Sequence, residues 1–210
     1  MAENPTSKES RTHEIMDVAQ DMIQTRGYNG FSYRDIANEI GIKSASIHYH
    51  FPGKGQLGRA VTARYCDHFM QALEELERQH PGNVKALLQG YVELYRSTLI
   101  ESDRLCLCGM LAGETETVPD EVKTEVTRFF QEQHQWLTKT VEQGLEKKEI
   151  SSEAQASESQ ASESQAIEAA VWATTILSTL EGAMFVARGF GDNEQFNIAA
   201  QSLLARLFQS

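Results

Sequence analysis

The amino-acid sequence predicts an all-α protein. Apolar residues recur at the spacing of amphipathic helices along most of the chain, and no segment alternates convincingly like a β-strand. Near the N-terminus, two short capped helices flank a glycine turn, which is the pattern of a helix-turn-helix. The 210 residues, 40% of them hydrophobic, suffice for a second and larger helical core. We therefore expect a three-helix domain over residues 8–55 and a larger helical domain over residues 56–210.

Caps and glycines mark the first two helices. The first helix carries an apolar stripe and is expected to end at Gly27. Ser32 then stands where a helix N-cap is preferred, and Asp35, three residues later, is placed to close a capping box. Apolar residues follow at helical spacing until Gly41 ends the second helix. A short turn then leads into the third.

The third helix is short and lies in a cationic stretch. We expect Ser44 to cap it and the Pro-Gly pair at residues 52–53 to stop it. Between Ile40 and Cys66 there is no Asp or Glu, although the formal net charge of the whole chain is −11. The cations of this stretch are Lys43, Lys54, Arg59 and Arg64. They could be a merely solvated face, but their register with the caps and the turn favours a positive surface for DNA.

The first quarter of the chain holds a further pattern at fixed spacing, made of Ile15, Ala19, Ile23, Gly27, Tyr28, Gly30, Phe31, Ser32, Asp35, Ile36, Ala37, Gly41, Ile42, Ser46, Ile47, His50, Phe51, Lys54 and Leu57. With this pattern, the segment resembles the DNA-binding domain of TetR-family transcriptional regulators. A match at so many positions is more specific than a match to one short motif. The resemblance implies a homodimeric repressor that binds a near-palindromic operator and releases it when a small molecule binds the C-terminal domain.

The same resemblance implies which residues contact DNA. Ser32 and Arg34 would lie near phosphate at the start of the second helix. The major groove would be faced by Lys43, Ser44, Ala45 and Ser46, whose side chains suit base edges. The phosphate backbone would be contacted by His48, Tyr49, His50 and Lys54. His48 departs from the family pattern, which more often has tyrosine at this position.

Four helices are expected between this domain and the C-terminal pair. Their ranges are about 54–80, 83–102, 105–112 and 119–149. A Pro-Gly pair stops the first of them, Asn83 can cap the second, and Pro119 suits the first turn of the last. The long first helix would link the two domains.

A doubled pentapeptide, ASESQ, occupies residues 156–165. Residues 151–165 contain no apolar side chain larger than alanine, so this segment cannot bury an apolar face. We expect it to be a mobile surface loop. The alternative is that the repeat extends the following helix as polar turns, since Ala, Glu and Gln favour helix.

The last two helices are expected over about 166–189 and 193–208. The first has too many small and apolar residues for one stripe, which indicates burial on two sides. One side would pack on the rest of the domain and the other on a second copy, so that two chains form a four-helix interface around a twofold axis. In a monomer the same face would be core.

Aromatic and polar side chains of the larger domain are candidates for a small-molecule site. They are Tyr91, Tyr95, Cys106, Met110, Phe130, His134, Trp136 and Trp172. Aromatic walls with a few polar groups are typical of ligand pockets, and equally of helical cores. Cys106 and Cys108 lie two apart and are not placed to bridge each other. One of them could act as an electrophile or redox sensor beside Arg104, or both could be buried, inert thiols.

Other functional classes are not indicated. The sequence has no zinc pattern, phosphate-binding glycine loop or nucleophile elbow, so we expect no enzyme, cofactor or metal. The longest uncharged run near the C-terminus, residues 169–180, is short for a membrane span, and the polar N-terminus does not suggest a secretory signal. Three cysteines without a disulfide pattern agree with a cytoplasmic protein. A helical interaction module that does not bind DNA is the remaining alternative.

Overall fold

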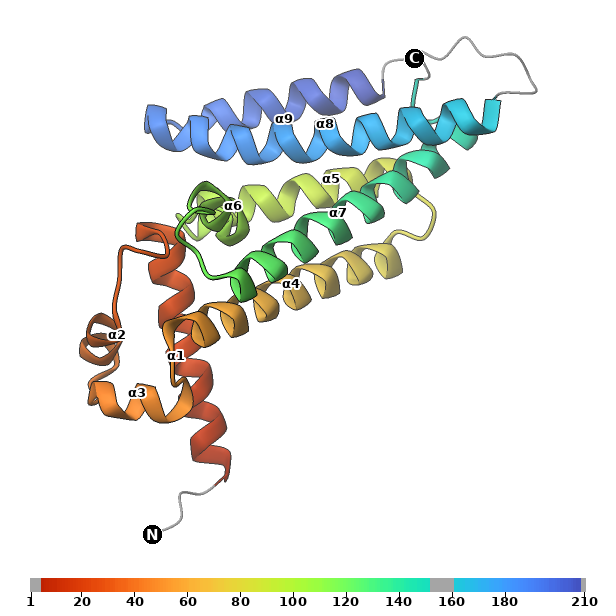
Figure 1. Ribbon diagram of the computed structural model, residues 1–210. Coiled ribbons are helices and arrows are strands. Elements are labelled where there is room, and N and C mark those ends of the chain that lie inside the picture. The colour runs from red at the N-terminus through yellow and green to blue at the C-terminus, as the bar shows by residue number, and fades with distance from the viewer. Residues whose placement is uncertain (1–4, 152–160, 209–210) are drawn as a thin grey trace. The chain divides into compact units, whose positions relative to one another are not determined.

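The computed structural model describes residues 5–151 and 161–208, and these residues form helices with no strand among them (Figure 1). The α-helices are α1 (Pro5–Arg26), α2 (Tyr33–Ile40), α3 (Ser44–His50), α4 (Lys54–Gln79), α5 (Val84–Arg96), α6 (Leu107–Gly113), α7 (Asp120–Glu146), α8 (Ala161–Phe190) and α9 (Glu194–Leu207). A π-helical turn, η1 (Ser97–Glu101), continues α5. The predicted all-α class is therefore confirmed.

The chain packs as two compact units. The first comprises residues up to 68 together with residues 104–129, and the second comprises residues 69–103 and 130 onward. Both long helices, α4 and α7, contribute their N-terminal halves to the first unit and their C-terminal halves to the second. The short helix α6 thus belongs to the unit that contains the helix-turn-helix.

The first unit has a small apolar core drawn from every one of its helices. Its fully buried side chains include Ile15, Ile23, Ile36, Ile47, Leu57, Leu107 and Leu111. Helix α1 contacts both α2 and α6, and α2 contacts α3. Because Ile36 and Ile47 are both at 0% exposure, α2 and α3 are held to each other by a common core.

The second unit is built around α5, α8 and α9. Helices α8 and α9 lie side by side, and both contact α5 (Figure 1). Tyr91 and Leu88 of α5 and Phe196 of α9 are almost completely buried. Helix α8 buries one row of residues, Ala169, Ala173, Ile176, Leu180, Met184 and Ala187.

The other side of α8 exposes several large apolar side chains. Its exposed large side chains are Ile167, Val171, Phe185, Val186 and Phe190. Residues 163–190 make α8 long and apolar enough to cross a membrane by length and composition, which corrects the expectation drawn from the uncharged run alone. One row of α8 is buried in the second unit. The apolar composition of α8 is therefore also that of a helix that packs against neighbours on two sides.

Three local expectations differ from the structure. Helix α3 begins at Ser44, and the N-cap position is Lys43 with an extended backbone (ψ 142°), so Ser44 is not the cap. The helix expected to reach residue 102 changes to the π-turn η1 at Ser97. The second copy of the repeat, residues 161–165, opens α8, which is the alternative to a loop; residues 152–160 lie outside the described residues.

Candidate nucleic-acid interface

The entry to α2 is fixed by the predicted capping box. Asp35 Oδ2 accepts hydrogen bonds from the Ser32 backbone N–H at 2.7 Å and from the Ser32 hydroxyl at 2.6 Å. These bonds, that to the Ser32 hydroxyl first, hold the pKa of Asp35 below its usual range. At the other end, Gly41 adopts a left-handed conformation (φ 70°), which lets α3 follow after a two-residue turn.

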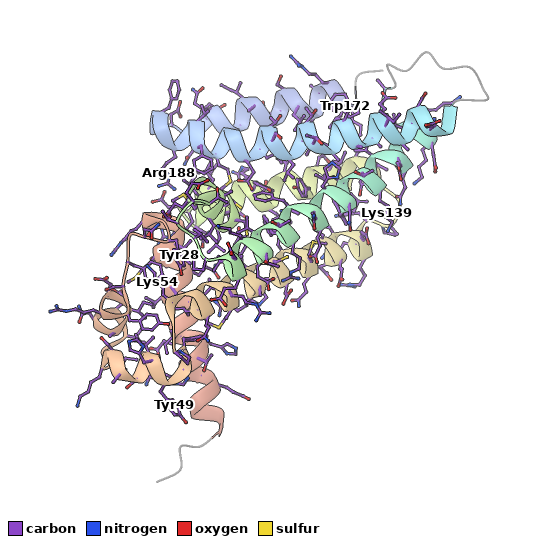
Figure 2. The ribbon with its side chains drawn as sticks, in the orientation of Figure 1. Tyr28, Tyr49, Lys54, Lys139, Trp172 and Arg188 are labelled. Carbon is purple, nitrogen blue, oxygen red and sulfur yellow. The ribbon has the colours of Figure 1, made fainter. Side chains whose placement is uncertain are left out.

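Helix α3 presents most of its polar side chains to solvent. Ile47 points into the core of the unit, whereas Lys43, Ala45, Ser46, His48 and Tyr49 are exposed. Figure 2 shows Tyr49 projecting outward from this helix, and its side chain is 66% exposed. On α2 and its cap, Ser32 and Arg34 are exposed as well. Most of the predicted DNA-contact residues therefore lie on the surface of two short helices that share one core.

A shallow hollow lies along α3. Its volume is about 470 Å³, and its lining residues are Arg11, Ile42, Lys43, Ala45, Ser46, Tyr49 and His50. Arg11 comes from α1 and is a cation that the sequence analysis missed. It forms an ion pair with Glu14 at 2.5 Å, one turn along the same helix. Its register on α1 could have been read from the sequence, but its place beside α3 depends on how the helices pack.

The two histidines of α3 contact neighbouring elements. The His48 ring packs edge-on against Tyr33 with 4.7 Å between ring centres, and its Nδ1 is 3.4 Å from the Pro52 carbonyl oxygen. His50 Nδ1 lies 2.9 Å from the Thr12 hydroxyl. His48 thus supports the α2–α3 pair through Tyr33, and His50 ties the end of α3 to α1.

Lys54 is placed differently from the prediction that it contacts phosphate. Its ammonium is partly buried and donates to the carbonyl oxygens of Tyr28 and Phe31, at 2.5 Å each. The Nζ atom also lies 4.7 Å from the ring centre of Tyr28 and 4.1 Å from that of Phe31. Desolvation lowers the pKa of Lys54, against the opposing influence of Glu114 and Asp35. This lysine stabilises the fold of the unit, and its charge is not directed to solvent.

The cationic stretch is likewise partly neutralised by partners. Arg59 pairs with Glu125 at 3.3 Å, and Arg64 pairs with Asp17 at 2.8 Å. Lys54 is directed at carbonyl groups, and Arg59 is exposed but paired with Glu125, so Lys43 is the exposed cation that this stretch places beside α3. The positive surface is therefore smaller than the sequence suggests and is centred on α3.

Part of the predicted small-molecule site does converge, in the second unit. The Tyr91 and Tyr95 hydroxyls lie 2.7 and 3.0 Å from Gln133 Oε1, and the Tyr95 hydroxyl is also 3.1 Å from Glu181 Oε1. Trp136 stacks on Tyr91 with 5.6 Å between ring centres, and its buried Nε1–H meets no hydrogen-bond acceptor among the residues that the structure describes. Sequence reasoning missed Gln133 and Glu181, because only packing reveals that they meet the tyrosines.

Four of the remaining candidates lie elsewhere, namely Cys106, Met110, His134 and Trp172. His134 Nε2 lies 3.0 Å from the Thr174 hydroxyl near the surface, and Trp172 lines a separate hollow between α8 and α9. Phe130 lies on α7, three residues before Gln133. Cys106 and Met110 belong to the first unit, at the N-cap and within α6.

The cysteines offer little to a solvent-borne reagent. Cys66, Cys106 and Cys108 form no disulfide among the described residues, and each is at most 2% exposed. The Cys106 sulfur accepts a hydrogen bond from the Gly109 N–H at 3.5 Å, so it acts as the cap of α6. Burial of this kind is typical of structural thiols. Across the described ranges, no group of His, Cys, Asp and Glu is arranged to hold a metal ion.

Comparison with known proteins connects this geometry to a family. Residues 15–61 match the family of bacterial regulatory proteins described as the tetR family. Over 65 residues the chain is 34% identical to the HTH-type transcriptional repressor KstR2 of Mycolicibacterium smegmatis, covering 31% of this chain and 32% of that protein. The chain therefore matches about a third of the length of that curated relative.

Two solved structures resemble nearly the whole chain. A TetR-family transcriptional regulator from Agrobacterium tumefaciens is 29% identical with a TM-score of 0.83, covering 98% of this chain and all of that one. A TetR transcriptional regulator from Legionella pneumophila is 27% identical with a TM-score of 0.78, covering 98% of each chain. Both are described as transcriptional regulators, which is the class expected from the sequence.

Proposed function

Because the chain belongs to the TetR family of transcriptional regulators, we propose that it is a repressor that binds operator DNA as a homodimer and is released by a small molecule. In this proposal, residues 8–55 read the DNA, and residues 56–210 provide dimerisation and ligand binding. A repressor of this kind works in the cytoplasm, where the DNA is.

The observation that carries the proposal is the exposed polar surface of α3 on a rigid support. Ile47 anchors the helix, while Lys43, Ala45 and Ser46 face outward beside a hollow. Their chemistry suits the major groove: lysine to guanine, serine to several bases, and the alanine methyl to thymine. Exposed Tyr49 and Arg34 are suited to phosphate contacts that fix the register of the protein on the duplex.

The proposed dimer interface is the exposed apolar face of α8 and α9. Ile167 and Val171 are 62% and 59% exposed, and they line a hollow of about 800 Å³ with Trp172 of α8 and Leu203 of α9. A contiguous apolar surface of this kind favours association. A second copy is the occupant we propose, since a twofold axis would pair α8 and α9 with their equivalents and present two α3 helices to one duplex.

The proposed ligand site is the polar cluster of Tyr91, Tyr95, Gln133 and Glu181. Hydroxyl, amide and carboxyl groups there lie among aromatic rings, and within the described part of the chain no acceptor meets the Trp136 N–H. A ligand that binds one conformation of the second unit more tightly would shift the population away from the DNA-binding state. Such coupling is typically about 1–3 kcal/mol, or roughly 5- to 150-fold in operator affinity.

Selection from random duplexes tests the DNA-binding part directly. Rounds of binding and amplification with the full chain should enrich a near-palindromic sequence, and affinity for it should fall steeply as salt rises. If the protein retards no duplex at low ionic strength, the proposed function is wrong.

A further inference from the structure

Glu114, the residue that follows α6, binds the loop between α1 and α2 through its carboxylate. Glu114 Oε1 accepts a hydrogen bond from the Tyr28 backbone N–H at 2.7 Å. Its Oε2 accepts from the Asn29 N–H at 3.1 Å and from the Asn29 side-chain amide at 2.6 Å. The same amide donates to the Thr117 hydroxyl oxygen at 2.6 Å. All these residues belong to the first unit, although about 86 positions separate Glu114 from Tyr28 in the sequence.

The backbone of this loop is shaped to receive the carboxylate. Gly27 ends α1 in a left-handed conformation with φ of 78°, which turns the next two N–H groups toward Glu114. A Cβ atom at Gly27 would overlap the Glu114 carboxylate. The close approach of Glu114 therefore depends on glycine at this position.

Lys54 binds the carbonyl groups of the same loop. The Lys54 ammonium donates to the Tyr28 and Phe31 carbonyl oxygens, at 2.5 Å each. An anion thus binds the loop N–H groups while a cation binds its carbonyl groups, and Tyr28 is held at both ends of its backbone. The loop leads directly to Ser32, the N-cap of α2, so its position sets where α2 and α3 begin.

We propose that Glu114 is the positioning residue through which α6 sets the DNA-binding competence of the helix-turn-helix. Its three hydrogen bonds hold the loop, the loop holds the start of α2, and α2 shares its core with α3. A displacement of α6 that withdraws the carboxylate would release the Tyr28 and Asn29 N–H groups and let the recognition helix move. This inference rests on the proposed function, because operator binding is what the positioning serves.

Charge-neutral variants at neighbouring positions test the proposal. Glu114→Gln keeps the shape of the side chain but removes its charge, whereas Glu116→Gln makes the same charge change at an exposed residue two positions away. We expect Glu114→Gln to bind the selected duplex about tenfold more weakly than wild type, within the range of typical couplings. Glu116→Gln should bind it within twofold of wild type.

Two further measurements separate positioning from a general loss of structure. In amide NMR spectra of the full-length protein, the Tyr28 and Asn29 signals should shift in Glu114→Gln and stay in place in Glu116→Gln. Asn29→Ala removes the exposed partner of Glu114 and should weaken binding by itself. Added to Glu114→Gln, it should weaken binding less than it does in the wild-type background. It also keeps the proposal testable if Glu114→Gln does not fold.

The outcomes distinguish this inference from the proposed function. If the wild-type protein binds no duplex, the function fails. If wild type binds but Glu114→Gln binds as tightly as Glu116→Gln, or if the effects of Glu114→Gln and Asn29→Ala simply add, the inference is overturned and the function stands.

Discussion

The two lysines near the recognition helix have different environments, so they should affect different measurements. Lys43 is exposed beside α3, and replacing it with alanine should reduce the slope of log affinity against log salt by about one per subunit. Lys54→Met should leave this slope close to that of wild type. It should lower the free energy of unfolding by about 1.5–3 kcal/mol, since two carbonyl groups lose a charged donor. Salt titrations of operator binding and denaturant unfolding of both variants check this prediction. It would be contradicted if log affinity fell equally steeply with log salt in both variants.

Two buried tyrosines of the first unit should make stability fall at alkaline pH. Desolvation raises the pKa of Tyr28 and of Tyr33 from 10.0 to about 12, with Glu121 adding to the effect at Tyr28. The folded state thus keeps protons that the unfolded state loses, so this contribution is full below pH 10 and is lost between pH 10 and 12.

Absorbance at 295 nm and unfolding measured over this pH range check the tyrosine prediction. Tyr33→Phe should remove part of the late-titrating phenol signal. It should also cost about 1 kcal/mol, since the Tyr33 hydroxyl donates to the Phe51 carbonyl oxygen at 2.9 Å. Full titration of all tyrosines near pH 10 in the folded protein would contradict the assignment.

At the residue scale, local signals were predictable and long-range partners were not. The capping box of Ser32 and Asp35 spans three residues, so its chemistry is visible in the sequence. The partners of Lys54 lie 23 and 26 positions away, and those of Glu114 about 85. Such pairs depend on tertiary packing, which is why Lys54 was predicted at phosphate and Glu114 was not singled out.

The two glycines that end α1 and α2 provide a matched pair at the scale of elements. Both are left-handed, at φ 78° and 70°, so alanine at either position should cost about 1–2 kcal/mol of stability. A Cβ at Gly41 meets nothing within 4 Å, whereas at Gly27 it overlaps the Glu114 carboxylate. Gly27→Ala should therefore weaken operator binding more than Gly41→Ala does. Thermal unfolding and anisotropy titrations measure both effects, and equal affinities would argue against the Glu114 contact.

Most helices were predictable because their starts and stops are local. Asn83 caps α5 by accepting from the Ala86 N–H at 3.0 Å, as predicted, and Gly27, Gly41 and Gly82 end their helices or turns with positive φ. The π-turn at Ser97 was not predictable, because the apolar spacing continues through it to Leu99, which is buried. The start of α8 within the repeat was ambiguous, since its residues favour helix but bury nothing.

At the scale of the whole molecule, the exposed apolar face of α8 should hold two chains together. Val171→Glu places a charge in the middle of the proposed interface and should convert the dimer to a monomer at micromolar concentration. Gln135→Glu adds the same charge at an exposed position of α7 and should remain dimeric. Sedimentation velocity distinguishes the two, and circular dichroism confirms that both are folded. A wild-type chain that sediments as a monomer would contradict this interface.

The division of the chain into compact units was less predictable than its helices. Residues 104–129 pack with the N-terminal helices, since α6 contacts α1 across some 90 positions. A domain prediction that follows the order of the chain assigns residues 104–129 to the second domain. The split of the predicted ligand residues has the same cause: Cys106 and Met110 share an amphipathic pattern with their neighbours but belong to the first unit.

Native mass spectrometry of the full-length protein with the duplex selected from random DNA tests the central claim most directly. The claim is that two chains present two α3 helices to one near-palindromic site. The account predicts a complex of two chains on each duplex, and its loss for Val171→Glu. The claim would be contradicted if the wild-type protein bound each duplex as one chain with its full affinity.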